Sequence, residues 1–250
     1  MATFSGSDEL RGAVVKNADL RGAQFRGCDL SGVVVRGSEL QQMEIDSPWI
    51  FDGDNVLLVN GVDVLPYVDA ELNRRFPGRS EQRAADPDGL RSAWAKVEST
   101  WAATLARAAA MPDGTVEASV DGEWSLTQTL RHLIMATDMW LGKGILGKAE
   151  PFHPVGLLDT GTAREGGPDG LQTAAPSYEE VLRARAGRQT MVRDFLAAAT
   201  ADLLAEPRPN PHDPDHDETV LSCLHTILEE EWEHHRYAAR DLDAIAAGRV

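Results

Sequence analysis

Cysteine is scarce in this chain of 250 residues, which contains only Cys28 and Cys223. Two cysteines so far apart provide no disulfide framework of the kind that stabilises small secreted domains. The amino-terminal sequence MATFSGSDEL also lacks the basic segment and the apolar segment of a secretory signal peptide. We therefore expect a protein of a reducing, cytoplasmic compartment.

Long apolar runs and positive charges are equally scarce. No stretch approaches the roughly 20 apolar residues that are needed to span a bilayer. The 24 Lys and Arg residues are outnumbered by 40 Asp and Glu residues, which gives a formal net charge of −16. Such a chain repels the phosphates of nucleic acids and anionic membrane surfaces. The composition thus argues against nucleic acids and membranes as partners.

The amino-terminal region contains a five-residue repeat. Residues 8–47 divide into eight consecutive pentads, from DELRG to MEIDS. The central residue of every pentad is bulky and apolar: Leu10, Val15, Leu20, Phe25, Leu30, Val35, Leu40 and Ile45. The residue two positions earlier is mostly small, and several pentads end in glycine. A period of five fits neither an amphipathic helix nor a plain strand.

The repeat resembles the pentapeptide-repeat family, which forms a right-handed β-solenoid with four pentads in each coil. The resemblance implies that residues 1–47 form a solenoid of two coils, with the central residues pointing inward. Two coils bury little apolar surface and leave exposed edges at both ends. We expect the apolar sequence PWIF at 48–51 to cap one of these ends.

Residues 48–87 are expected to form a capping strand and helix followed by a linker. The sequence NVLLVNGVDV at 55–64 predicts a strand and a tight Asn-Gly turn. Apolar residues at every fourth position predict a helix over 64–76. The polar stretch 78–89 predicts the linker to the next domain.

Residues 88–250 are expected to form a four-helix bundle, so that the chain is mainly α. Apolar spacings of three and four, together with the capping-box sequences SLTQ and SYEE, mark the helices. These helices are expected at residues 90–111, 125–146, 177–199 and 218–247, with Asp217 capping the last one. The long, Gly- and Pro-rich connection 147–176 is typical of a bundle with a crossover.

The last predicted helix has two polar residues, one turn apart, within its apolar stripe. Glu231 and His235 lie on one face, where residues four apart have Cβ atoms about 5–6 Å from each other and can bind one ion. A buried carboxylate is costly unless it is paired or binds a metal. A metal-free Glu–His pair explains the same pattern. Glu230 and His234 offer an alternative register; we prefer Glu231 and His235, whose stripe continues to Leu242.

Two segments of this domain resemble the DinB-like superfamily of four-helix bundles. WSLTQTLRHLIMATDMW (124–140) is similar to the family's second helix, with a histidine in a Leu-x-His-Leu context. EEEWEHHRYAARDL (229–242) is similar to the fourth helix, where two ligands four residues apart meet a His-His-Arg sequence. The resemblance implies a metal site of His132, Glu231 and His235. This donor set suits zinc, and also nickel, iron or manganese.

Within that superfamily, a His, Glu, His set is found in proteins similar to mycothiol-dependent maleylpyruvate isomerase. The resemblance therefore implies a metal-dependent thiol S-transferase or isomerase that uses a low-molecular-weight thiol, such as mycothiol, on a small electrophilic substrate. The alternative is a non-enzymatic interaction protein or small-molecule binder. In that case the metal is structural, and the solenoid docks a partner or forms a homodimer interface.

Other polar residues are weaker candidates for the site. His153, on the long connection, could line an entrance or could be an ordinary loop histidine. His212 and His216 fit a surface ion site less well than they fit a solvated acidic loop. Arg131 and Arg236 could bind a substrate carboxylate, although surface salt bridges are the usual role of such residues.

Overall fold

The computed structural model describes residues 4, 10–158 and 176–249, so that most of the predicted 147–176 connection lies outside the described residues. The chain divides into two compact units, Met1–Asp46 and Ser47–Val250. None of the described helices is long and apolar enough to cross a membrane.

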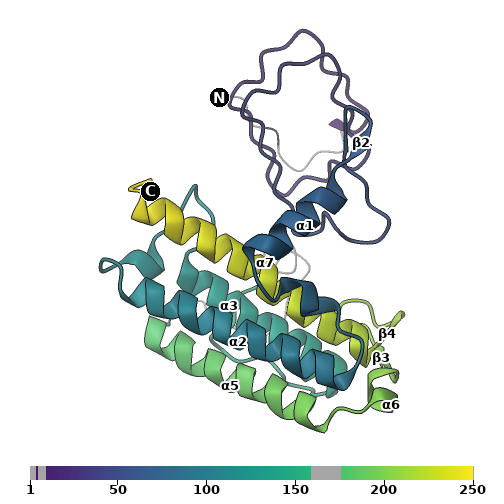
Figure 1. The fold of residues 1–250 in the computed structure, drawn as a ribbon, viewed down its shortest axis with the longest axis vertical. Helices are drawn as coiled ribbons and strands as arrows, with labels where there is room; N and C mark the ends of the chain where they lie inside the picture. The colour runs from purple at the N-terminus through teal and green to yellow at the C-terminus, as the bar shows by residue number, and fades with distance from the viewer. Residues whose placement is uncertain (1–3, 5–9, 159–175, 250) are drawn as a thin grey trace. The chain divides into compact units, whose positions relative to one another are not determined.

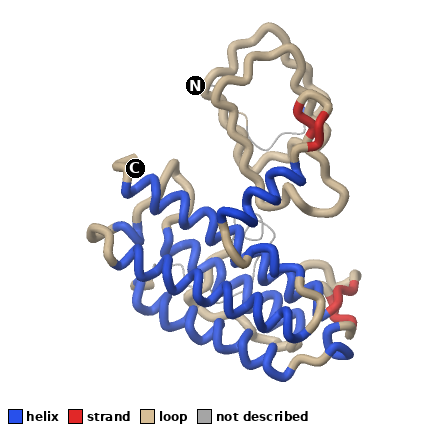
Figure 2. The backbone as a smooth tube through the Cα atoms, viewed as in Figure 1, coloured by secondary structure: helices blue, strands red, loops and turns tan. Residues whose placement is uncertain are grey.

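The described part of the first unit, residues 10–46, repeats its backbone conformation without forming a strand (Figure 2). The amide of every tenth residue from Ala13 to Met43 donates a hydrogen bond of 2.9–3.3 Å to the carbonyl three residues earlier. The backbone is left-handed at every fifth residue, namely Gly12, Asn17, Gly22, Gly27, Gly32, Gly37 and Gln42. The five-residue period that the sequence predicts is therefore present in the backbone.

The central apolar residues of the pentads are exposed. Their exposed fractions run from 46% at Leu30 to 65% at Phe25. The described residues thus do not show the predicted β-solenoid with an apolar interior. A repeat of two coils gives each central residue at most one stacking partner, so little apolar surface is available for burial.

Four long helices lie side by side in the second unit (Figure 1). They are α2 (Pro87–Ala109), α3 (Leu126–Thr137), α5 (Tyr178–Ala198) and α7 (Val220–Ala246). Their main contacts join α2 to α7, α7 to α3, α3 to α5 and α5 to α2. The predicted mainly helical bundle is therefore present. The four contacts form a closed ring of helices, in which α5 lies diagonally opposite α7 and α2 lies diagonally opposite α3.

Side-chain caps set the starts of these helices. Both predicted capping boxes form. The side-chain oxygens of Ser125 and Ser177 accept from the backbone N–H of the residue three positions later, and the side chain of that residue accepts from the backbone N–H of the serine. The cap of α7 is Thr219. The predicted cap, Asp217, instead begins β4 (Asp217–Thr219), which pairs with β3 (Pro207–Pro209). A four-residue helix, α6 (Ala201–Leu204), precedes this hairpin.

The second bundle helix continues as a π-helix, η4 (Asp138–Ile145), which the sequence analysis did not predict. Asp138 is almost fully buried and accepts hydrogen bonds of 2.8 and 3.0 Å from Arg188 of α5. It also accepts a 2.8 Å bond from the backbone N–H of His153. One buried carboxylate thus holds α5 and the start of the long connection against η4.

The segment before the bundle begins with the predicted hairpin, β1 (Leu58–Val59) and β2 (Val62–Asp63). The predicted helix follows as α1 (Leu65–Arg75). The next segment is not the linker that the polar sequence suggested. It forms a 3₁₀ helix, η2 (Arg79–Arg83), which packs against α2 and α7. Arg79 and Gln82 are both buried there, so a polar composition concealed a packed element.

The core of the bundle is built around large aromatic residues. Trp94 and Trp101 of α2 and Trp232 of α7 are each no more than 2% exposed. Burying one large apolar side chain stabilises a fold by about 1.5–3 kcal/mol.

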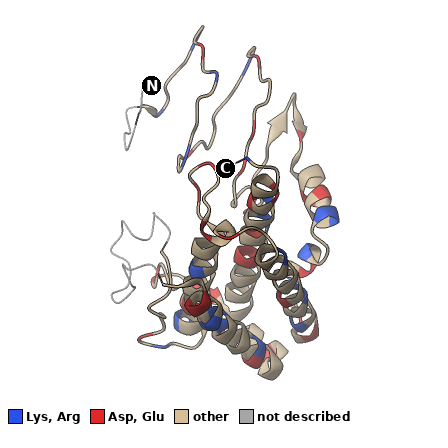
Figure 3. Ribbon diagram, turned by 90° about the vertical axis from the view of Figure 1, so that its left-hand side faces the viewer, with Lys and Arg blue, Asp and Glu red and all other residues tan. Residues whose placement is uncertain are grey.

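A short 3₁₀ helix, η3 (Thr115–Glu117), leads from α2 to α3. In Figure 3, acidic and basic residues both occur along the bundle helices.

Alanine substitutions at two glycines are expected to change the stability in opposite directions, one through backbone strain and the other through helix propensity. Gly78 has a φ of 102°, and an added Cβ would lie 3.0 Å from the Cβ of Lys96. Gly187 lies within α5, with nothing within 4 Å of an added Cβ. We expect Gly78→Ala to lower the free energy of unfolding by about 1–3 kcal/mol, and Gly187→Ala to raise it by about 0.5–1 kcal/mol. Urea denaturation measures the free energy of unfolding of both variants. Equal changes in the two variants would contradict the packing of η2.

Candidate metal centre

Three side chains of the kinds that bind metals meet where α3 packs against α7. They are His132 of α3 and Glu230 and His234 of α7, whose candidate ligand atoms all lie within 4.8 Å of one another. The Nε2 atom of His132 and the Nδ1 atom of His234 are each 3.2 Å from Oε2 of Glu230. Within the described part of the chain, no other cluster of His, Cys, Asp and Glu is this tight.

The histidines of this cluster have a chemistry that fits a cation. Nδ1 of His234 lies 2.9 Å from the backbone carbonyl of Glu230 and can donate to it, which places the lone pair of the neutral ring on Nε2. Burial and the neighbouring His132 lower the pKa of His234 to about 4, so this imidazole is neutral near pH 7. Nδ1 of His132 is buried without a hydrogen-bond partner among the described residues. Two imidazoles and one carboxylate form a suitable donor set for zinc.

Aromatic side chains enclose the cluster. The ring of Trp124 lies 4.9 Å from that of His132 and 6.3 Å from that of His234, measured between centroids. The Tyr237 ring contacts His234 edge-on at 6.0 Å. Of the three candidate ligands, Glu230 is the most exposed, at 30% of its side chain. A small molecule would therefore reach the cluster from the side of Glu230.

The preferred register of the sequence analysis needs correction, because Glu231 and His235 do not join His132. Both carboxylate oxygens of Glu231 accept from Nη2 of Arg185. Nε2 of His235 lies 2.8 Å from the hydroxyl of Thr104. The group that can hold a metal contains the alternative pair, Glu230 and His234.

The reason for this correction lies in the geometry of the bundle. The periodicity correctly placed Glu231 and His235 on the core-facing stripe, since they are 1% and 7% exposed. His132, however, comes from α3, which is an adjacent helix of α7. An adjacent helix meets the flank of the core stripe, where Glu230 and His234 lie. Periodicity identifies the buried face but not the neighbour that each residue on it contacts.

The ion pair of Arg185 and Glu231 crosses the bundle diagonally, from α5 to α7. Burial raises the pKa of Glu231, and the charge of Arg185 opposes this effect. Burial also lowers the pKa of His235 to about 4. Arg185 was not among the predicted site residues, although it follows the buried Val181 by four residues in α5. The same periodicity that drew attention to Glu231 would have found it.

The weaker candidates have structural contacts. Arg131 donates a 2.9 Å bond from Nε to the carbonyl of Val155 and so holds the long connection. Arg236 pairs with Glu233 at 2.9 Å. The remaining three are histidines with loop contacts: His153 accepts from the N–H of Val155, His212 packs against Trp140, and His216 pairs with Asp213. Trp124 lies in the quoted motif, but its contact with the two histidines was not predicted.

The buried ion pair generates a stability prediction. Arg185→Met leaves Glu231 as an uncompensated buried charge, which should lower the free energy of unfolding by about 3–5 kcal/mol. The double variant Arg185→Met, Glu231→Leu should recover much of this loss, because it removes both charges. Arg183→Met is the matched control, since Arg183 forms an exposed pair with Glu179. Denaturant unfolding tests this, and additive losses in the double variant would contradict it.

Comparisons with known proteins match both parts of the chain. The family model described as the DinB superfamily matches residues 96–238. The model described as Pentapeptide repeats matches residues 9–42 in eight copies. No curated protein and no solved structure matches the chain. Both resemblances drawn from the sequence are thereby confirmed, and because the first model covers more than half of its length, the chain belongs to the DinB superfamily.

Proposed function

We propose that His132, Glu230 and His234 bind one divalent metal ion, most readily zinc, and that this metal centre is catalytic. The convergence of the three side chains at the contact between α3 and α7 is the observation that carries this proposal. Membership of the DinB superfamily fits a metal-dependent protein. Nickel, iron and manganese are the other ions that this mixed donor set suits.

The proposed activity is that of a thiol S-transferase or isomerase that uses a low-molecular-weight thiol of the mycothiol type. When bound, the ion would lower the pKa of such a thiol, so that a thiolate forms at neutral pH. The cysteine of the second unit is unsuited to this role. Cys223 is fully buried, and burial raises its pKa to about 11.

The residues around the centre would position the small molecules. Trp124 stacks against His132 and His234 and shields that side of the ligands. Glu230 marks the accessible side. In the proposed transfer, the thiolate sulfur adds to one carbon of an activated double bond of the substrate. The π-electron pair moves to the neighbouring carbon, which takes up a proton from solvent in place of the proton that the thiol released. In the proposed isomerisation, the thiol adds and is later eliminated, so it is regenerated.

Metal content tests the ligand set. We expect the full-length protein, loaded with zinc and desalted, to retain about one equivalent by elemental analysis. His132→Ala and His234→Ala should each lose more than about tenfold in affinity, because each removes a ligand. His235→Ala is the matched control and should retain the metal. Zinc that is retained by His234→Ala and lost by His235→Ala would favour Glu231 and His235 as the ligands. A native protein that retains no zinc would contradict the proposed metal centre.

Thiol chemistry tests the activity separately. Zinc-loaded protein should bind mycothiol and conjugate or isomerise a small electrophile, and Glu230→Gln should reduce the rate by about 100-fold, because it removes a charged ligand. The rate is measured by loss of free thiol or by chromatography of the product.

Tight metal binding without thiol binding would instead favour the non-enzymatic alternative. In the described residues 10–46, the exposed central apolar side chains of the pentads are the feature that favours a docking role, because large apolar surfaces often mark interaction sites.

A further inference from the structure

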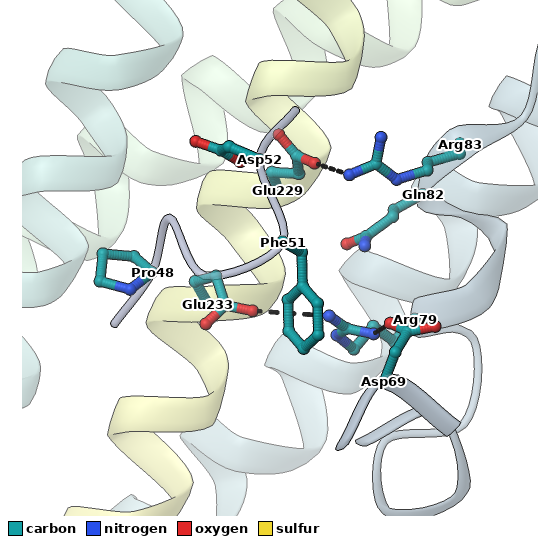
Figure 4. Close-up of a pocket in the computed structure, with 9 residues that line it drawn as sticks. All are labelled: Pro48, Phe51, Asp52, Asp69, Arg79, Gln82, Arg83, Glu229 and Glu233. Atoms are coloured by element: carbon teal, nitrogen blue, oxygen red, sulfur yellow. Dashed lines mark hydrogen bonds and ion pairs between the residues drawn. The ribbon is translucent and has the colours of Figure 1, made fainter. Parts of the chain in front are cut away.

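A second polar site lies elsewhere in the same unit, between residues 48–52, η2 and α7 (Figure 4). It is a cavity of about 170 Å³. A water molecule occupies about 30 Å³ in the liquid, so the cavity has room for a small organic group. Its lining comes from four segments, residues 48–52, α1, η2 and α7, which include the 3₁₀ helix that was expected to be a linker.

Negative charge predominates in the lining. The four acidic residues Asp52, Asp69, Glu229 and Glu233 face only two arginines. Arg79, which is 3% exposed, bonds to Asp69 at 2.6 Å and lies 3.9 Å from Glu233. Arg83 bonds to Glu229 at 2.7 Å. Glu233 also pairs with Arg236, which lies outside the lining, at 2.9 Å. Of the four acids, Asp52 is therefore the one without an ion pair among the described residues.

Asp52 carries the least compensated of these charges. Asp52 is exposed at the mouth of the cavity, its carboxylate forms no hydrogen bond with any described residue, and the nearby charge of Arg83 favours its ionised form. Burial raises the pKa of Asp52, an effect that Arg83 partly opposes. A cation next to Asp52 would favour the ionised carboxylate.

Gln82 provides an independent indication of a ligand. The residue is only 7% exposed, and its side-chain amide forms no hydrogen bond with the described residues. In Figure 4, this amide points from η2 into the space between η2 and α7. An amide that faces a cavity can donate to and accept from a ligand there. The Nε atom of Arg79 in the same lining is also buried and without a partner in the described structure.

The acids of the cavity do not converge as the ligands of one metal ion do. Among the described residues, only the group of His132, Glu230 and His234 brings three ligand atoms close enough for one ion. The carboxylates of the cavity come from residues 48–52, α1 and α7, and two of them pair with the arginines of η2. Such a lining suits a ligand that carries its charge on a larger group with several N–H donors.

We propose that this cavity binds a small organic cation, a primary ammonium or guanidinium group. Its charge would face Asp52, and one of its N–H groups would donate to the amide oxygen of Gln82. The group belongs either to a free diamine-like molecule or to a basic side chain of a protein partner. This site is separate from the proposed metal centre and does not depend on its activity.

Calorimetric titration of the full-length protein tests the proposal. The probes are agmatine and putrescine as free cations, Nα-acetyl-lysine methylamide as a model of a basic side chain, and 1,4-butanediol as a neutral control. We expect saturable one-to-one binding of at least one cation and none of the diol. Binding of free cations would indicate a metabolite, and binding of the capped lysine alone would indicate a protein partner.

Matched variants identify the site. Asp52→Asn should weaken cation binding by about tenfold or more, because it removes the charge that faces the ligand. Asp54→Asn makes the same change at a residue that is exposed like Asp52 but lies outside the lining, and it should change the affinity less than about twofold. Gln82→Met, which keeps the length of the side chain, should weaken binding by several-fold.

Two results would overturn the proposal. The first is the absence of saturable binding of all three cations at millimolar concentrations. The second is an equal loss in Asp52→Asn and Asp54→Asn, which would mean that cations are attracted only by the net charge of −16. Thermal unfolding of each variant shows that it is folded, and Gln82→Met, which leaves the charge unchanged, keeps the test valid if Asp52→Asn does not fold.

Discussion

The rotational setting of α7 about its own axis is the constraint on which the candidate site depends. Successive residues of an α-helix differ by about 100° in direction, so a fixed direction for one side chain fixes its neighbours. Three polar contacts define this setting. Glu230 meets His132 of α3, Glu231 meets Arg185 of α5, and His235 meets Thr104 of α2. Each of the other three bundle helices thus provides one contact that orients α7.

The most costly of these contacts is also the most specific. A buried ion pair contributes little net stability, because the desolvation of both charges offsets their attraction. Rotating α7 by one residue would separate Glu231 from Arg185 and leave both charges buried and unpaired. The pair therefore contributes more by disfavouring the other rotational setting of α7 than by stabilising the fold. It allows Glu230 and His234, rather than the next pair along, to face His132.

Periodicity and capping sequences predicted the elements of the bundle better than they predicted its contacts. The helices begin at Ser125 and Ser177 as expected, because a capping box is a local interaction between residues three apart. The ligand register was missed because it depends on which helix lies beside α7, which is a tertiary property. Gln82 was missed because a polar residue in a polar stretch gives no sign of burial. The pentads predicted the backbone repeat but not how far the central side chains are buried.

The sequence EEEWEHH of α7 illustrates why a charged run need not be a solvated face. Its residues point to different neighbours: Glu229 to Arg83, Glu230 to His132, Glu231 to Arg185, Trp232 to the core, Glu233 to Arg236, and His235 to Thr104. His234 completes the candidate metal cluster. The same stretch of α7 thus faces two polar environments on different sides, the metal cluster toward α3 and the acidic cavity toward η2. Because a helix rotates as a unit, the contacts that orient one of these environments also orient the other.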